Sequence, residues 1–129
     1  MRQLFLAALT CALTTQPAFA TGDVYCTAVD GSDATFGYGF GRVPGLAIIS
    51  ATISVGGQEW SMVEAKDAIP IRVAQGAHDG PHTIIDFTDL EFSEIIASVR
   101  IISAVVGDDY RAVGLLRVPN VGVFSMTCE

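Results

Sequence analysis

Hydrophobic and polar residues alternate with a period of two along several short stretches of the chain. From Ile49 to Val55 the odd-numbered positions are apolar and the even-numbered positions are Ser or Thr. This pattern predicts a strand with one buried face and one face in water. From 69 to 73, Ile and Val alternate with Pro70 and Arg72, and Pro70 cannot donate a hydrogen bond to a neighbouring strand. We therefore expect an edge strand there, or a strand that begins just after a break.

Turn signals separate these stretches at near-regular intervals. Pro44-Gly45 suits a type II turn, and Gly56-Gly57 suits a two-residue hairpin connection. Short β-rich runs with turns at this spacing are typical of an all-β sandwich or barrel, so we expect a small antiparallel barrel or sandwich of about eight strands. The remaining turn signals lie at 30–33, 79–81, 107–109 and 119–120.

The segment 88–106 fits two kinds of secondary structure. Its apolar residues recur at helical spacing, and Thr88 with Glu91 would form a capping box at a helix start. The positions from 99 to 105 also alternate as in a strand, and they are rich in β-branched residues. We predict one short helix near 89–96 that leads into a strand at about 97–106, paired with 110–118. A single longer helix is the alternative.

The first twenty residues have the pattern of a secretory signal peptide. Arg2 supplies the positive charge, 4–15 the short apolar run, and Ala18-Phe19-Ala20 a cleavage site. We therefore expect a leader at 1–20, a single β-domain at 21–129, and a periplasmic or secreted protein.

Two cysteines remain once the leader, with Cys11, is removed. Cys26 and Cys128 lie near the two ends of the domain. Because an exported chain meets an oxidising compartment, the pair is expected to form a structural disulfide, with two buried thiols as the alternative. A bridge needs Cα atoms within about 7 Å, so it would bring the first and last strands together.

The charge balance is acidic. The chain has seven basic and fourteen acidic residues, and loss of Arg2 with the leader changes the net charge from −7 to −8. Such a charge argues against nucleic acid as a partner and favours a basic protein partner. After Ala20 no apolar run approaches the ~20 residues that a membrane-spanning helix needs, so no membrane span is expected.

Glycine and aromatic residues alternate from Phe36 to Gly41. On a strand the aromatic side chains would point to one side and Gly37, Gly39 and Gly41 to the other. Glycine weakens a strand interior, so three of them predict a bare strip that admits a ligand or a partner. The alternatives are cover by a large neighbouring side chain and a sharply coiled strand.

Both histidines of the chain lie in one short segment, where His78, Asp79 and His82 are candidate metal ligands. The Gly80-Pro81 pair between them excludes the helical spacing that makes such ligands effective, so a solvated polar loop is favoured. We expect no metal and no cofactor.

Four carboxylates cluster at Asp86, Asp89, Glu91 and Glu94, and two of them would suit the acid and base of a glycoside hydrolase. A solvated acidic face is the alternative, and the chain holds no familiar catalytic motif. We therefore expect a non-catalytic binding module. A small-ligand or metal carrier that uses a barrel mouth near the glycine strip or the histidine segment is the first alternative, and a small hydrolase is the second.

Overall fold

Ten β-strands and their turns make up the protein from Thr21 to Glu129. The computed structural model describes residues 21–129, and the predicted leader, with Cys11, lies outside them. The described residues contain no helix, and thus no helix able to cross a membrane. The all-β prediction is confirmed, with ten strands where about eight were expected. They are β1 (Thr21–Ala28), β2 (Thr35–Arg42), β3 (Leu46–Val55), β4 (Gln58–Ser61), β5 (Ile69–Pro70), β6 (Arg72–Asp79), β7 (His82–Thr88), β8 (Ile95–Val106), β9 (Asp109–Val118) and β10 (Gly122–Cys128).

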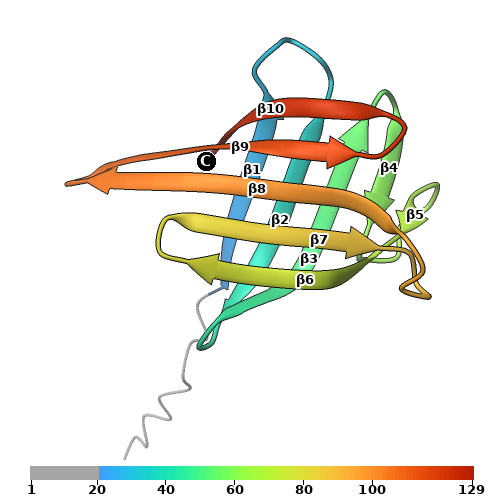
Figure 1. Ribbon diagram of the computed structural model, residues 1–129, viewed down its shortest axis with the longest axis horizontal. Helices are drawn as coiled ribbons and strands as arrows, with labels where there is room; N and C mark the ends of the chain where they lie inside the picture. Colours follow the sequence, from blue (N-terminus) through green and yellow to red (C-terminus); the bar gives the residue numbers. More distant parts are fainter. Residues whose placement is uncertain (1–20) are drawn as a thin grey trace, which may run out of the picture.

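The strands form one sheet that curls into a nearly closed barrel. Their order is β5-β4-β3-β2-β1-β10-β9-β8-β7-β6, and all neighbours are antiparallel except β4 and β5. In Figure 1, β1 to β4 lie behind β6 to β10, and the two groups cross at a steep angle. At the open seam, β6 approaches β3 so closely that a Cβ on Gly76 would lie 3.3 Å from Ile48 Cδ1. The curled sheet thus encloses a single core.

The predicted aromatic row faces this core. Phe36 is fully buried, and its ring stacks on Tyr38 with centroids 5.5 Å apart. From the opposite layer, Phe87 meets Phe36 edge-on at 5.9 Å. Ile53 and Leu116 are also fully buried. Aromatic contacts between the layers therefore hold the two sides of the barrel together.

The short helix predicted near 89–96 is wrong, as is the longer helical alternative. The Asp89 carboxylate accepts a hydrogen bond from the Ser93 backbone N–H at 2.7 Å and another from the Ser93 hydroxyl. Phe92 adopts a φ of 58°, in the left-handed region. This local capture of backbone donors forms a turn instead of a helix. The predicted strand follows directly, as β8.

The predicted alternation from 49 to 55 holds except at its first residue. Ala51, Ile53 and Val55 are buried, whereas Ile49 is 56% exposed. In the β2–β3 register, Gly39 pairs with Ser50 and Phe40 pairs with Ile48, so Ile49 has no partner. Such a β-bulge reverses the facing of every residue beyond it. The expectation that Ile49 lies on the buried face is therefore wrong.

The edge strand predicted around Pro70 is confirmed. β5, Ile69–Pro70, is the outermost strand on its side of the sheet and pairs only with β4. Ile71 follows it and is buried. The missing N–H of Pro70 therefore leaves no gap in the interior of the sheet.

The predicted disulfide joins the first and last strands. Cys26 and Cys128 lie directly opposite each other in the β1–β10 ladder and form a bridge across a Cα–Cα distance of 4.0 Å. Beside the bridge, Tyr25 and Glu129 exchange backbone hydrogen bonds of 3.0 and 2.9 Å. A disulfide in so small a β-domain fits an extracellular compartment.

Candidate functional site

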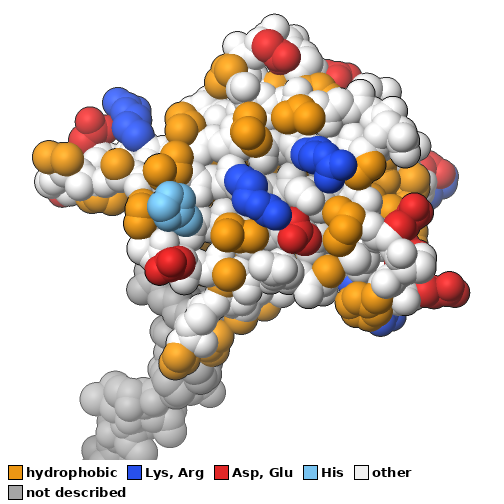
Figure 2. Space-filling model, in the orientation of Figure 1, with side chains coloured by type: hydrophobic (Ala, Val, Ile, Leu, Met, Phe, Trp, Pro, Cys, Tyr) orange, Lys and Arg blue, Asp and Glu red, His pale blue; other side chains and the backbone are white. Residues whose placement is uncertain are grey.

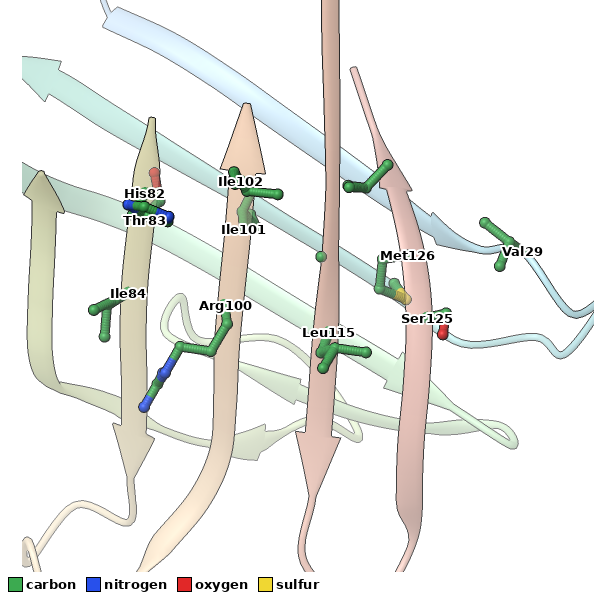
Figure 3. A pocket seen from close by; sticks show the side chains of 12 residues that line it. Val29, His82, Thr83, Ile84, Arg100, Ile101, Ile102, Leu115, Ser125 and Met126 are labelled. Atoms are coloured by element: carbon green, nitrogen blue, oxygen red, sulfur yellow. The ribbon is translucent and has the colours of Figure 1, made fainter. Parts of the chain in front are cut away.

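The outward side of β7 to β10 carries large apolar side chains where an antiparallel sheet usually presents polar ones. Ile102 is 48% exposed, Val113 53% and Leu115 49%. They surround a hollow of about 600 Å³ that Figure 3 shows from close by, with side chains contributed by neighbouring strands. We name this area the outer surface, defined by His82, Ile84, Arg100, Ile102, Val113, Leu115 and Ser125, with Val29 at its margin.

The sequence indicates that some strands are apolar on both faces, although alternation alone does not show which face points outward. From Val99 to Val106, both odd and even positions are mostly apolar, and 113–116 repeats this with Val, Gly, Leu and Leu. One set of positions packs into the core, with Val99 and Leu116 buried. The other set must then point outward. A strand with apolar residues on both sides predicts contact on both sides.

Arginine side chains stand among these apolar groups. Arg100 is held in place, because its Nη1 lies 2.8 Å from Asp86 Oδ1 and donates to the Val99 carbonyl at 2.8 Å. Arg111 lies 3.4 Å from Asp109, and both are largely exposed. Arg117 forms no ion pair with any residue that the structure describes. Figure 2 shows basic side chains in the middle of this face, between apolar ones.

Charge is distributed unevenly along the domain. Residues 95–128, which form β8 to β10, contain three Arg and two Asp, a net charge of +1. The rest of the domain has three basic and twelve acidic residues, a net charge of −9, and the two parts together give −8. The strands that carry Ile102, Val113 and Leu115 are therefore the least acidic part of this acidic domain.

The predicted glycine strip is only partly bare. A Cβ on Gly37 would lie 3.3 Å from the Tyr25 ring, and one on Gly39 would lie 2.6 Å from Ser50 Oγ. A Cβ on Gly41 would meet no atom within 4 Å. Neighbouring side chains thus cover the first two glycines, and open space remains at the third.

The two histidines lie on opposite faces of the β6–β7 hairpin. His78 pairs with Thr83 on the inner side, where His78 Nδ1 lies 3.0 Å from Thr83 Oγ1. His82 pairs with Asp79 on the outer side and lines the outer surface. Among residues 21–129, no three His, Cys, Asp or Glu side chains gather closely enough to hold a metal ion.

Two of the clustered carboxylates have structural partners. Asp86 forms the ion pair with Arg100, and Asp89 binds the turn at Ser93. Hydrogen bonds from Ser93 lower the pKa of Asp89 below its ordinary value. A general acid needs a raised pKa, so Asp89 is unsuited to the acid role in glycoside hydrolysis.

A second hollow lies at one end of the barrel, and we name it the barrel mouth. It has a volume of about 410 Å³ and is lined by Tyr38, Phe40, Gly41, His78 and Tyr110, with Val24, Val43, Gly45 and Leu46. It brings together the open end of the glycine strip and the inward-facing histidine. Burial raises the pKa of Tyr38, against the effect of a hydrogen bond with Thr83, so the phenol is uncharged at neutral pH.

The fold and these two hollows define a small, disulfide-bonded, all-β barrel domain. Comparison of the chain with protein-family models, curated proteins and solved structures found no match.

Proposed function

We propose that this protein is an exported, non-catalytic binding module whose outer surface docks a protein partner. The observation that carries the proposal is the group of half-exposed apolar side chains on β8 and β9: Ile102, Val113 and Leu115. Contiguous apolar side chains on a folded domain are typical of interaction sites. The leader pattern and the disulfide support export to the periplasm or out of the cell.

Charge complementarity indicates the chemistry of the partner. Arginine is enriched at the centres of protein interfaces, and here Arg100 lines the hollow while Arg117 lies two residues from Leu115 on β9. A matching partner would present apolar residues together with Asp or Glu. The net charge of the whole domain instead predicts a basic partner, which would approach its acidic remainder. Substitutions on the outer surface distinguish an acidic partner from a basic one.

The first experiment compares two valine substitutions in the mature, disulfide-bonded protein. Val113 is 53% exposed on the outer surface, and Val63 is 57% exposed in the loop before β5. Immobilised wild-type protein and each variant would capture partners from an extract of the export compartment. Val113→Asp should weaken binding of the captured partner at least about tenfold, or 1.4 kcal/mol, while Val63→Asp leaves it unchanged. Equal capture by both variants, or none by the wild type, would overturn the proposal.

The second experiment reverses one charge in two places. Arg117→Glu and Lys66→Glu change the net charge equally, but only Arg117 lies on the strands of the outer surface. An acidic partner should lose affinity for Arg117→Glu alone, and added salt should reduce the difference. Similar strengthening of binding by both variants would identify the basic partner and refute the acidic one.

A further inference from the structure

We propose that the barrel mouth is a binding site for a small aromatic molecule. The site lies where the strands of both layers end: the C-terminal ends of β2 and β6, and the N-terminal end of β9. Because it faces the inside of the barrel, it is separate from the outer surface. The inference therefore does not depend on the proposed function.

The size and walls of the mouth suit a small ring system. Its volume of about 410 Å³ falls within the range of ligand pockets, roughly 300–1,000 Å³. The Tyr38 and Phe40 rings lie 5.9 Å apart at 40° to each other and form one aromatic wall. An aromatic ligand would stack or pack edge-on against these rings.

Tyr110 forms another part of the wall because the β8–β9 hairpin extends beyond its neighbours. The β7 ladder stops at Ile102, and the β10 ladder stops at Ala112. The rest of the hairpin is therefore two-stranded and projects from the sheet, as Figure 1 shows. Tyr110 lies in this part and is 45% exposed, so a bound ring would cover aromatic surface that water now contacts.

The polar groups of the mouth favour a molecule with a hydrogen-bonding group. With Nδ1 of His78 engaged by Thr83, the ring is oriented and Nε2 is the nitrogen left to bond a ligand. The Tyr38 phenol, neutral at ordinary pH, adds no charge.

The two histidines provide a matched pair of variants on one hairpin. His78→Ala alters the mouth, whereas His82→Ala alters the outer surface. Phe40→Ala removes one ring of the aromatic wall of the mouth. Tyr110→Ala removes an exposed part of that wall and keeps the test usable if loss of the Phe40 ring impairs folding.

The experiment is a fluorescence titration of the mature protein with N-phenyl-1-naphthylamine, an uncharged aromatic amine that emits strongly in apolar surroundings. We expect saturable binding of one molecule per chain. Phe40→Ala should weaken it at least about tenfold, and His78→Ala and Tyr110→Ala should weaken it severalfold. His82→Ala and Val113→Asp should have no effect.

Three results would overturn the inference. The first is the absence of saturable binding. The second is binding that Phe40→Ala and Tyr110→Ala leave unchanged. The third is loss of binding in Val113→Asp, which would place the dye on the outer surface. Because partner capture by the outer surface is measured separately, failure of one proposal leaves the other standing.

Discussion

A methyl group added at Gly114 should destabilise the barrel, because this glycine lies where two strands come unusually close. Gly114 pairs with Ile101 on β8 and with Met126 on β10. A Cβ there would overlap the Arg100 carbonyl oxygen and lie 3.1 Å from Ile101 Cα. Both are backbone atoms, so no side-chain rotation relieves the clash and the strands must separate.

The expected magnitude follows from comparison with two other glycines. Gly114→Ala should cost about 1–3 kcal/mol, the usual range for overpacking. A Cβ in Gly37→Ala would lie 3.3 Å from the Tyr25 ring, which is exposed and can move aside, and in ordinary contact with the Val24 carbonyl oxygen at 3.7 Å, so the change should stay within about 0.5 kcal/mol. Gly41→Ala meets nothing and reduces the freedom of the unfolded chain, so it should stabilise by up to about 1 kcal/mol.

Urea denaturation followed by circular dichroism would measure all three variants at constant temperature. The urea concentration at the midpoint of unfolding should fall for Gly114→Ala and remain equal or rise for the other two variants. The slope of the free energy of unfolding against urea concentration should not change. In thermal scans, Gly114→Ala should melt lower by about 4–8 °C per kcal/mol. A Gly114→Ala protein as stable as the wild type would refute the close approach of β8 and β9. So would a Gly41→Ala protein that is the least stable of the three.

Two further predictions concern the disulfide and the turn before β8. Replacing Cys26 and Cys128 by Ala should lower the melting temperature by more than about 8 °C, because disulfides across loops of this length contribute roughly 2–4 kcal/mol to stability. A smaller fall would mean that the β1–β10 ladder is stable without the disulfide. The pKa of Asp89 is lowered in the folded state. The ionised carboxylate therefore stabilises the fold fully above its unfolded pKa of about 4, and this stabilisation is lost as the pH falls through the folded pKa. Between about pH 5 and pH 2, the melting temperature of Asp89→Asn should therefore fall less than that of the wild type. An equal fall in the two proteins would contradict this prediction.

The sequence determined the features that depend on a few neighbouring residues. Gly56 and Gly57 both adopt positive φ, at 59° and 81°, as a two-residue hairpin requires. Pro70 lies at an edge because any strand interior would miss its N–H. The cysteine pair was predictable from its count and expected compartment alone. These outcomes follow from local backbone chemistry, which the rest of the fold does not override.

Packing of the curled sheet decided what local chemistry leaves open. Ile49 turned outward because a bulge in β3 shifted its register against β2, and alternation alone cannot reveal a shift. Turn formation at Asp89 replaced a helix because the side chain captured backbone donors that a helix would have used.

Both candidate sites depend on the same long-range packing. β8 and β9 are apolar on both faces, so only burial of Val99 and Leu116 against the opposite layer left Ile102 and Val113 in water. Gly41, His78 and Tyr110 are far apart in sequence and share one cavity because the sheet closes on itself. Sequence periodicity specifies which residues share the face of a strand, but only the closed sheet specifies which faces meet.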